Sequence, residues 1–286
     1  MKQTTALRHL LDKPGILAAP GAYDALSALL VQEAGFPAVY VTGSGIAHSN
    51  GWPDLGLVTL TEVIDRVGKI ADAVGVPVIA DADTGYGNAI NLMRTVHLFE
   101  KAGVAGIHIE DQVTPKRCGH YEGKSVVPKE EAVKKIEAAL EARQDKDFVI
   151  IARTDARAVN GFEDAIDRAR AYREAGADAV FVEAVQSQEE WRLVPKLVDA
   201  PCLANMVKEG KSPPLTVRQL EEMGYRIVIF AGDIQRAAIY GMREVLKELK
   251  EKGSNMEFTA MAGFQDRAHI VGLDRVQELE RRFLSL

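Results

Sequence analysis

The chain alternates between short apolar runs and longer segments whose apolar residues recur every three or four positions. Short apolar runs are typical of buried strands, and the three- and four-residue spacing is typical of helices with one buried face. Eight apolar runs lie within residues 15–24, 38–45, 76–87, 106–112, 148–156, 178–185, 201–207 and 226–233. Helical segments separate them, at residues 24–35, 59–75, 89–103, 128–143, 162–176, 189–198 and 216–224. The pattern predicts an α/β protein made of repeated strand–helix units.

Repeated units of this kind favour a closed barrel. Several helical segments reach a glycine and turn at once into the next strand, as in EAGFPAV at 33–39 and EAGADAV at 174–180. Continuous apolar strands separated by helices indicate a parallel sheet that is covered on both faces. Eight units fit a (β/α)₈ TIM-type barrel over residues 1–233, and an open doubly wound sheet is the alternative.

The pattern changes after residue 233. Residues 234–253 form a strong helical segment with Glu and Lys at helical spacing, and residues 255–286 contain more helix and no obvious strand. Residues 234–286 are therefore predicted to be a C-terminal helical extension of the same domain. Two placements stay open, because the extension could pack on a neighbouring subunit or cover the barrel of its own chain.

The composition is that of an ordinary globular protein and disfavours several functions. The 286 residues are 47% hydrophobic and 27% charged, with a net charge of −6 spread over interleaved acidic and basic residues. A nucleic-acid partner is not expected, since phosphate binding needs a basic face. No apolar run reaches the length of about 18 residues that spans a membrane. Two cysteines, Cys118 and Cys202, cannot staple a chain of this length, which predicts a reducing cytoplasm.

Most of the apolar runs become polar at their carboxyl ends. The residues there are Thr42, Gly43, Ser44, Asp81, Asp83, Glu110, Asp111, Arg153, Asp155, Glu183 and Asn205. In a barrel these ends converge on one face, and active sites of barrel enzymes lie on that face. The sequence therefore predicts a polar site at the mouth of the barrel.

Two aspartates in DADTGYG predict a metal site. Asp81 and Asp83 stand two apart, and side chains two apart on a strand point the same way. Paired carboxylates repel unless a cation lies between them or one is protonated. Oxygen ligands favour Mg²⁺ or Mn²⁺ over Zn²⁺, and Glu110 is a plausible third oxygen group. The alternative for Asp83 is a cap on the following helix.

Arg153 and the TGSG segment are candidates for binding an anion. Arg153 follows a buried apolar run, and its planar guanidinium suits a substrate carboxylate. A structural ion pair with Glu110 or Glu183 is the alternative, and both roles can hold together. The TGSG segment at 42–45 is expected to expose backbone N–H groups to a ligand oxygen.

Cys118 lies in an unusual place for a cysteine. The segment TPKRCGHYEG surrounds it with Lys116, Arg117 and His120, which favour the thiolate and predict a thiol more acidic than usual. Such a thiol can donate a proton to a carbanion or attack as a nucleophile. The nearby glycines indicate a mobile loop that closes over substrate. Cys202, by contrast, is predicted to be a core residue.

Together these segments resemble the isocitrate lyase/phosphoenolpyruvate mutase superfamily over essentially the whole chain. DADTGYG, HIEDQVTPKRCGH, IARTDA and ANMVKEGKSP stand where that family has its signatures. PKRCGH resembles the branch that includes 2-methylisocitrate lyase and dimethylmalate lyase. CGHYEGK and NMVKEGKSPPLT also resemble carboxyphosphonoenolpyruvate mutase. Tyr121-Glu122-Gly123 replaces the basic stretch found in methylisocitrate lyases, which weakens the case for a tricarboxylate substrate.

The resemblance implies a set of site residues, a cofactor and an assembly. The implied metal ligands are Asp81, Asp83, Asp54 and Glu110, which would bind Mg²⁺ or Mn²⁺. The implied catalytic residues are Cys118, Arg153, Tyr40, Glu110 and His120, with Cys118 as proton donor. The implied substrate-binding residues are Thr42, Gly43, Ser44, Asp81, His108, Lys116, Gly119, Arg153, Glu183 and Asn205. The family also implies a homotetramer in which the eighth helix is swapped between subunits.

The resulting hypothesis is cleavage of the C2–C3 bond of a 2-hydroxy di- or tricarboxylate. Tyr40 or a carboxylate near the metal would take the hydroxyl proton, and Cys118 would protonate the carbanion that leaves, so that pyruvate or a similar keto acid remains. One alternative is phosphonomutase chemistry, which forms a phosphorus–carbon bond. Another is a non-catalytic keto-acid sensor on the same fold. A Schiff-base aldolase is disfavoured, because no lysine ends an apolar run and Lys116 belongs to a loop.

Overall fold

The computed structural model describes residues 1–284 and contains a closed barrel of eight parallel strands in sequence order. The strands are β1 (Leu17–Ala22), β2 (Val39–Val41), β3 (Val78–Asp81), β4 (Gly106–Glu110), β5 (Val149–Thr154), β6 (Ala179–Val182), β7 (Cys202–Asn205) and β8 (Ile227–Phe230). Pairing of β1 with β8, from Leu17–Ile227 to Pro20–Phe230, closes the ring. The predicted barrel is confirmed and the open-sheet alternative is wrong.

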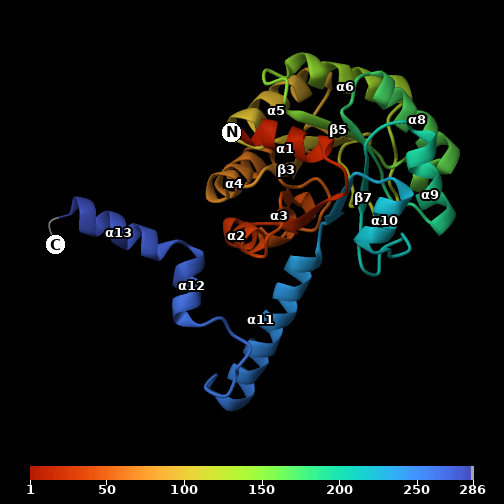
Figure 1. Cartoon of the computed structure of the whole chain (residues 1–286). Helices are drawn as coiled ribbons and strands as arrows, with labels where there is room; N and C mark the ends of the chain where they lie inside the picture. The colour runs from red at the N-terminus through yellow and green to blue at the C-terminus, as the bar shows by residue number, and fades with distance from the viewer. Residues whose placement is uncertain (285–286) are drawn as a thin grey trace. The chain divides into compact units, whose positions relative to one another are not determined.

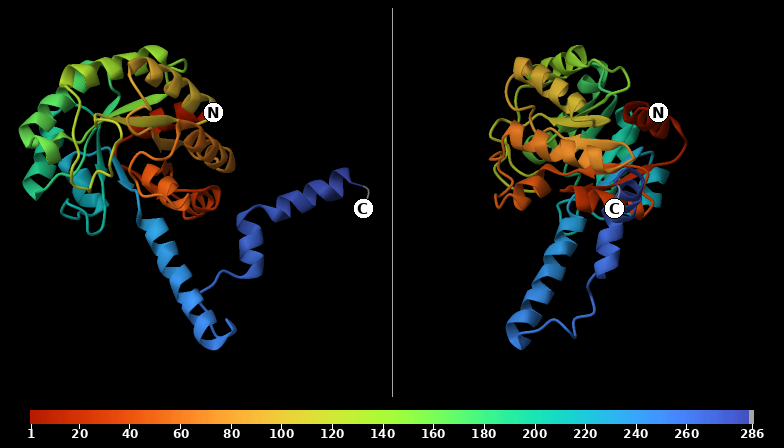
Figure 2. Two further views of the ribbon diagram at one scale, coloured as in Figure 1. Left: turned by 180° about the vertical axis from the view of Figure 1, so that it is seen from behind. Right: turned by 90° about the vertical axis from the view of Figure 1, so that its left-hand side faces the viewer.

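Helices connect the strands and cover the outside of the ring (Figure 1). The connecting helices are α2 (Ala25–Glu33), α3 (Gly43–Ser49), α4 (Leu60–Ala73), α5 (Ala89–Lys101), α6 (Lys129–Ala142), α7 (Ala156–Val159), α8 (Phe162–Glu174), α9 (Gln188–Leu197) and α10 (Val217–Met223). Figure 2 shows the same arrangement from behind and from the side. Each of the seven helical segments predicted between the strands contains a helix, whereas α3 and α7 were not predicted.

Side-chain caps fix where several of these helices begin. The Asp24 carboxylate accepts the backbone N–H of Ser27 at 2.7 Å and starts α2. Thr59 and Glu62 form a reciprocal capping box at the start of α4, and Asn88 caps α5. Each cap satisfies N–H groups that have no partner inside the helix, and such a cap typically contributes about 1 kcal/mol. The turns after the strands are thereby held in defined conformations.

The helix α1 (Gln3–Asp12) closes the amino-terminal end of the barrel. Its Leu7 is fully buried and packs in one cluster with Leu17, Val149 and Ile227, which are the first residues of three strands. Arg8 Nε donates to the carbonyl oxygen of Asp147, just before β5, at 3.1 Å. The sequence pattern did not predict this helix. The polar carboxyl ends of the strands lie at the opposite end of the barrel.

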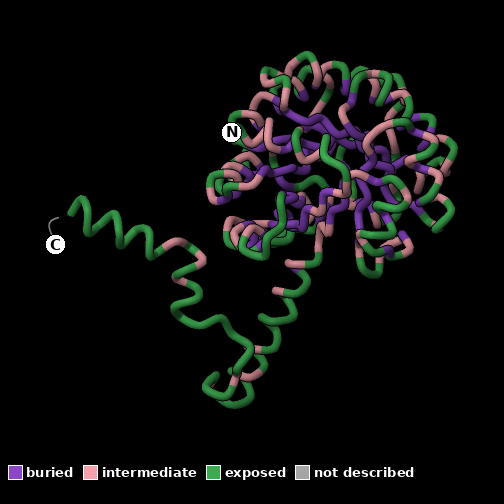
Figure 3. Tube along the Cα trace, in the orientation of Figure 1, coloured by how far each residue is buried: buried purple, intermediate pink, exposed green. Residues whose placement is uncertain are grey.

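The core lies between the strands and the helices, as Figure 3 shows by the buried residues concentrated in the sheet. Interior side chains of the strands form one cluster, and a second cluster joins β6, β7 and β8 to α8, α9 and α10. Cys202 belongs to the second cluster and is fully buried, so its predicted core position is confirmed.

The chain divides into two compact units, Met1–Asp233 and Ile234–Leu286. The second unit holds α11 (Asp233–Lys252) from its second residue onward, α12 (Phe264–Ile270) and α13 (Leu273–Phe283). Within its described residues only Gln235 is buried, and several large apolar side chains are exposed, among them Tyr240, Leu246 and Phe264. Across residues 1–284 no helix combines the length and apolar character needed to cross a membrane.

Candidate active site

The candidate site lies at the carboxyl ends of the strands, where the predicted polar side chains are buried. Tyr40 lies in β2, Asp81 ends β3, His108 and Glu110 lie in β4, Arg153 lies in β5, Asn205 ends β7, and Glu183 directly follows β6. None of these seven is more than 8% exposed. Ionisable side chains are almost never buried to this extent unless they are paired. Their pairing divides the site into two halves.

The first half, called the acidic half below, consists of Asp54, Asp81, Asp83 and Lys116. The Lys116 ammonium lies 2.5 Å from Asp54 Oδ1 and 2.7 Å from Asp83 Oδ1. Burial disfavours the charged lysine, but the carboxylates of Asp83 and Asp54 outweigh it and raise the pKa of Lys116 well above its usual range. Lys116 is therefore a permanent ammonium between two carboxylates, which makes it a poor Schiff-base nucleophile.

The predicted geometry of the two neighbouring aspartates needs correction. The strand β3 ends at Asp81, and Asp83 has a positive φ of 47°, so the alternation of strand side chains does not relate them. The Asp83 backbone N–H instead donates to Asp81 Oδ1 at 2.9 Å. The capping alternative for Asp83 is also wrong, because Asn88 caps the helix that follows. Burial raises the pKa of both carboxyl groups.

The four predicted metal ligands are all carboxylates, which suits a hard divalent cation. Among residues 1–284 no three His, Cys, Asp or Glu side chains converge closely enough to bind a metal ion, and Lys116 lies between Asp54 and Asp83. Glu110 Oε1 is buried and has no hydrogen-bond partner within the described part of the chain. The oxygen donors thus fit Mg²⁺ or Mn²⁺ in kind, and a metal ion between Asp54 and Asp83 would have to displace the Lys116 ammonium.

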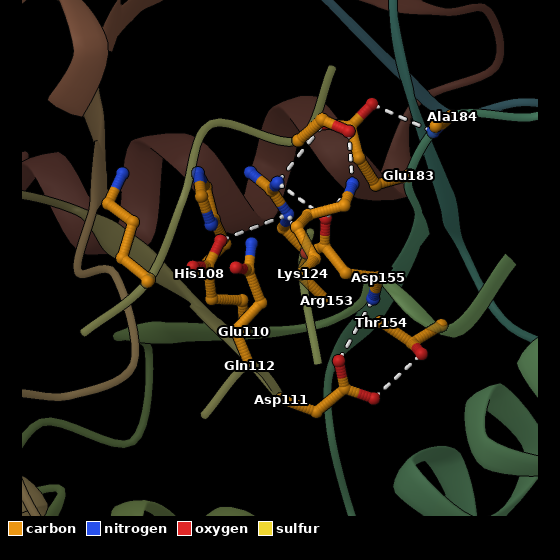
Figure 4. A network of polar contacts seen from close by, with 12 residues as sticks. His108, Glu110, Asp111, Gln112, Lys124, Arg153, Thr154, Asp155, Glu183 and Ala184 are labelled. Carbon is orange, nitrogen blue, oxygen red and sulfur yellow. Dashed lines mark hydrogen bonds and ion pairs between the residues drawn. The ribbon is translucent and has the colours of Figure 1, made fainter. Parts of the chain in front are cut away.

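The second half, called the arginine half below, consists of Arg153 and three carboxylates around it (Figure 4). Arg153 Nε lies 2.9 Å from Asp155 Oδ2 and 3.3 Å from Glu110 Oε2. Its Nη2 lies 3.4 Å from Glu183 Oε2. The predicted ion pairs with Glu110 and Glu183 are therefore both present. Burial raises the pKa of Glu110 well above its usual range despite the opposing charge of Arg153.

His108 and Tyr40 lie at the boundary between the halves. The Tyr40 hydroxyl and His108 Nε2 form a 2.7 Å hydrogen bond, and His108 Nε2 lies 3.6 Å from Asp81 Oδ1. Burial, with a smaller contribution from Arg153, lowers the pKa of His108 to about 3, so the imidazole is neutral. Burial also raises the pKa of Tyr40 well above its usual range. The Tyr40 phenol is therefore better suited to donate a proton than to accept one.

Cys118 lies on the loop between β4 and α6, defined here as the Cys118 loop (residues 111–127). Its backbone N–H donates to the carbonyl oxygen of Asp54 at 3.1 Å, which places the thiol beside the acidic half. Burial, supported by the Asp54 charge, raises the pKa of Cys118 to about 11. The prediction of an acidic thiol is therefore wrong, because burial and carboxylates outweigh the nearby cations. A thiol that stays protonated at neutral pH remains suited to donate a proton.

The tip of the Cys118 loop lies against the arginine half. A Cβ at Gly119 would lie 2.6 Å from Arg153 Nη2 and 2.7 Å from Glu183 Cγ, so only glycine permits this approach. His120 Nε2 lies 3.7 Å from Glu183 Oε1, and His120 Nδ1 accepts the backbone N–H of Lys211 at 3.2 Å. The structure thus brings His120, Glu183 and the loop after β7 together, as the predicted site requires.

Asn205 and the TGSG segment complete the rim. Asn205 Nδ2 donates to Glu183 Oε2 at 3.3 Å. Thr42 caps α3 by accepting the Gly45 backbone N–H at 3.2 Å, so the segment is a helix start rather than a free turn. A Cβ at Gly43 would lie 2.7 Å from Asp81 Oδ2, which brings the first turn of α3 against the acidic half. The binding of a ligand oxygen by N–H groups of this segment stays a prediction.

Two buried residues were not predicted as part of the site. Asp155 follows β5 and makes a two-pronged ion pair with Arg153, and Lys124 from the Cys118 loop lies 3.0 Å from Asp155 Oδ1. Asp155 was recognised as polar at a strand end, and its spacing of two from Arg153 was the available signal. No such signal in the sequence pointed to Lys124, because only the folding of the loop brings its ammonium close to the end of β5.

Comparison with protein families gives one match that covers most of the chain. A family profile described as phosphoenolpyruvate phosphomutase matches residues 7–250. The 2,3-dimethylmalate lyase of Eubacterium barkeri is 44% identical over 291 residues, covering 100% of this chain and 99% of the relative. The 2-methylisocitrate lyase of Aeropyrum pernix is 51% identical over 251 residues, covering 88% of this chain and 81% of the relative.

Solved structures agree with these sequence relatives. A crystal structure of 2,3-dimethylmalate lyase, described as a member of the PEP mutase/isocitrate lyase superfamily, superposes with a TM-score of 0.93 at 41% identity and covers 99% of this chain and 95% of its own. A phosphonopyruvate hydrolase complex with oxalate and Mg²⁺ superposes with a TM-score of 0.91 at 32% identity and covers 100% of both chains. Both matches include the candidate site and the C-terminal unit.

Proposed function

Because the chain belongs to the phosphoenolpyruvate phosphomutase family and is an enzyme of the isocitrate lyase/phosphoenolpyruvate mutase superfamily, we propose that it is a Mg²⁺-dependent carbon–carbon lyase. Its substrate would be a 2-hydroxy di- or tricarboxylate resembling 2-methylisocitrate or dimethylmalate, and its products a keto acid such as pyruvate and a carboxylate. The observation that carries this proposal is the free Cys118 thiol held on a loop beside a buried carboxylate cluster and Arg153.

The acidic half would bind a cation, and the arginine half would bind an anion. The carboxylates of Asp81, Asp83, Asp54 and Glu110 would hold Mg²⁺, which is the cation in the related phosphonopyruvate hydrolase structure. Bound there, Mg²⁺ would polarise the substrate's C2 oxygen and adjacent carboxylate and would offset the negative charge that develops on them. Arg153 would bind a substrate carboxylate, and the helix start at Thr42–Ser44 would donate N–H groups to the keto-acid end.

Bond cleavage requires a base for the C2 hydroxyl proton. Glu110 is the favoured base, since its buried Oε1 accepts no hydrogen bond from the described residues and is the free oxygen of a carboxyl group beside Arg153. Tyr40 is less suited, because burial keeps its phenol protonated. As the O–H bond breaks and the C2 carbonyl forms, the C2–C3 bond breaks and its electron pair stays on C3.

Cys118 would complete the reaction by protonating C3. The thiol gives its proton to the carbanion and becomes a thiolate, and the proton held by the base returns the enzyme to its starting state after product release. A pKa of about 11 keeps the Cys118 thiol protonated at neutral pH. Such proton transfer typically contributes about 10²–10⁴-fold to the rate.

The decisive experiment is a substrate screen with matched variants. Wild-type protein with Mg²⁺ is incubated with 2-methylisocitrate, isocitrate, dimethylmalate, oxaloacetate or phosphonopyruvate, and keto-acid release is measured. Cys118→Ser should lose about 10²–10⁴-fold in turnover on the cleaved substrate while retaining Mg²⁺-dependent oxalate binding. Cys202→Ser, in the core behind the sheet, is the cysteine control. Equal turnover of Cys118→Ser and wild type would rule out the proton-donor role.

The mutase alternative is separated by the same screen. Phosphonopyruvate or a carboxyphosphonate would then be converted with formation or loss of a phosphorus–carbon bond, which phosphorus NMR detects directly. Activity of that kind without cleavage of any hydroxy acid would replace the lyase proposal. Tight oxalate or pyruvate binding without any turnover would instead identify a keto-acid binding protein.

We also propose that the protein is a homotetramer in which the C-terminal helical extension (234–286) packs on a neighbouring subunit. Support comes from the apolar side chains that this extension exposes, including Tyr240, Leu246, Phe264 and Phe283. Large apolar side chains exposed along one segment are typical of protein interfaces. Light scattering after gel filtration would measure the mass, and a monomer over the working concentration range would contradict the assembly.

A further inference from the structure

Lys124 and Asp155 form a buried ion pair that joins the Cys118 loop to the arginine half. Lys124 Nζ lies 3.0 Å from Asp155 Oδ1, and the two side chains are 2% and 0% exposed. A buried charged pair is costly to form and is retained only with good geometry and further hydrogen bonds. No role in the mechanism described above uses either residue, so their burial beside Arg153 needs an explanation.

Asp155 is the residue that both cations share. Its Oδ2 accepts from Arg153 Nε at 2.9 Å, and its Oδ1 accepts from Arg153 Nη2 at 3.2 Å and from Lys124 Nζ at 3.0 Å. Figure 4 shows Lys124 and Arg153 approaching the same carboxylate. The strength of one contact therefore depends on the other, because one carboxylate charge is divided between two cations.

Asp111, which directly follows β4, binds the backbone of Asp155. Asp111 Oδ1 accepts the backbone N–H of Asp155 at 2.9 Å, while its Oδ2 accepts from the hydroxyls of Thr154 and Tyr172, each at 2.7 Å. These bonds fix the end of β5, where Arg153 and Asp155 lie. The backbone of Asp155 is thereby tied to the end of β5, whereas Lys124 lies farther along the Cys118 loop.

The Lys124 ammonium changes the balance of charge around Arg153. Arg153 faces the carboxylates of Glu110, Asp155 and Glu183, so one guanidinium balances three carboxylates. With Lys124 in place, a second cation balances Asp155. Less of the positive potential of Arg153 is then cancelled by its own neighbours, and more is available to an anion at the mouth of the barrel.

We propose that Lys124 and Asp155 are positioning residues that couple the closed position of the Cys118 loop to the binding of a substrate carboxylate by Arg153. The inference rests on the proposed function, in which Arg153 receives that carboxylate. Lys124 also donates to the carbonyl oxygen of Gly119, the residue whose Cα lies against Arg153 and Glu183. The same ammonium thus holds the loop tip and balances Asp155.

Coupling of this kind acts in both directions. If the closed loop strengthens anion binding, then a bound anion must favour the closed loop by the same factor. Oxalate serves as the probe, since it is the ligand in the related Mg²⁺ complex of phosphonopyruvate hydrolase. Arg117 is exposed on the loop and provides a trypsin site whose cleavage reports on loop position.

The test compares Lys124→Met with wild type in the presence of Mg²⁺. Methionine keeps the apolar stem and removes the ammonium. We expect oxalate affinity, measured by calorimetry, to fall about 10-fold, within the 5–150-fold range typical of coupled sites. Oxalate should protect wild type from tryptic cleavage after Arg117 and should protect Lys124→Met much less. In steady-state kinetics the substrate KM should rise more than kcat falls.

Two further variants separate positioning from a general structural role. Lys124→Arg keeps the charge and should recover most of the oxalate affinity and protection. Lys129→Met removes a lysine just beyond the loop, whose partner Asp167 lies on the surface, and should behave as wild type. Asp155→Asn removes the partner of Lys124 at β5 and should reduce the protection by oxalate as Lys124→Met does, while Arg153 loses one competing carboxylate. Circular dichroism checks that each variant is folded.

The outcomes distinguish this inference from the function on which it rests. Wild-type protein that neither binds oxalate with Mg²⁺ nor cleaves any hydroxy acid would overturn the proposed function, and the coupling with it. An active wild type together with a Lys124→Met variant of unchanged oxalate affinity and unchanged protection would overturn the coupling alone. A Lys124→Arg variant as impaired as Lys124→Met would likewise overturn it, because charge would then not be the cause.

Discussion

The acidic half and the arginine half of the site both bury several carboxylates, but they obtain their positive charge differently. In the arginine half the cation is Arg153, which is part of β5 and is held by Asp155 at 2.9 Å. In the acidic half the cation is Lys116, which belongs to the Cys118 loop. A strand residue of the barrel cannot leave without local unfolding, whereas a loop residue can.

This difference indicates which half accepts an external cation and which accepts an external anion. If the Lys116 side chain swings away while the loop stays closed, Asp54 and Asp83 would lose the ammonium between them and would bind a divalent cation instead. Arg153 is held at β5 by Glu110, Asp155 and Glu183, and in the proposed function it would bind a substrate carboxylate. In this proposal the acidic half exchanges Lys116 for a metal ion, and the arginine half keeps Arg153. Such a site suits a reaction on an anion that the metal and Arg153 bind together.

The largest effect is expected from Arg153→Met. Glu110, Asp155 and Glu183 would lose a buried partner, and removing one member of such a buried network typically costs about 3–5 kcal/mol of unfolding free energy. Turnover should be lost as well. Urea denaturation measures the stability change. Arg192→Met, at an exposed pair with Glu189, should change it by less than about 0.5 kcal/mol. Equal stability of the two variants would show that Arg153 is not the fixed cation.

The second effect concerns metal affinity in the acidic half. Asp83→Asn should weaken Mn²⁺ binding about 10–100-fold, because a neutral amide is a poorer ligand for a hard cation. Electron paramagnetic resonance of free Mn²⁺ measures the affinity. Asp65→Asn, on the surface of α4, is the matched control. Unchanged Mn²⁺ affinity in Asp83→Asn would place the metal elsewhere.

The third effect is the reactivity of Cys118, which lies beside the acidic half. Since its pKa is raised to about 11, the thiolate fraction is small at neutral pH and grows about tenfold per pH unit until the pH approaches that value. Alkylation by iodoacetamide in Cys202→Ser protein should be about 20-fold slower at pH 7.5 than that of a free thiol, allowing for the greater nucleophilicity of a more basic thiolate. A rate that levels off near pH 8 would show that the nearby cations dominate instead.

The smallest effect is expected from Lys116→Met. Removing the competing ammonium should tighten Mn²⁺ binding about 5-fold, because binding no longer requires the lysine to leave. The metal-free protein should at the same time melt at a lower temperature, since Asp54 and Asp83 lose their partner. Thermal melts with and without Mn²⁺ measure both changes. Weaker Mn²⁺ binding in this variant would show that Lys116 assists the metal rather than replacing it.

The fold was predictable because its signals repeat along the chain. Each of the eight apolar runs contains a strand, and each helical segment between them contains a helix. The helix α1 was missed, since its apolar face is short and only the barrel end gives it a partner. The helix α3 was missed because Gly43 and Gly45 are poor helix formers and signal a turn, whereas the Thr42 cap starts a helix there.

Most residues of the candidate site could be predicted from the sequence, but their pKa shifts could not. Strand ends and spacing located Asp81, Glu110, Arg153 and Glu183. Sequence neighbours suggested an acidic Cys118, but burial and Asp54 reverse that shift. The pKa of a group depends on the charges that folding brings near it and on how far folding removes it from water. The neighbouring residues in the sequence determine neither of these.

The packing of α1 against the first residues of β1, β5 and β8 has a practical consequence. It places the amino terminus at the end of the barrel remote from the candidate site. An affinity tag or surface tether attached there would leave the approach of small acids unobstructed, so immobilised protein should retain the kinetics of free protein.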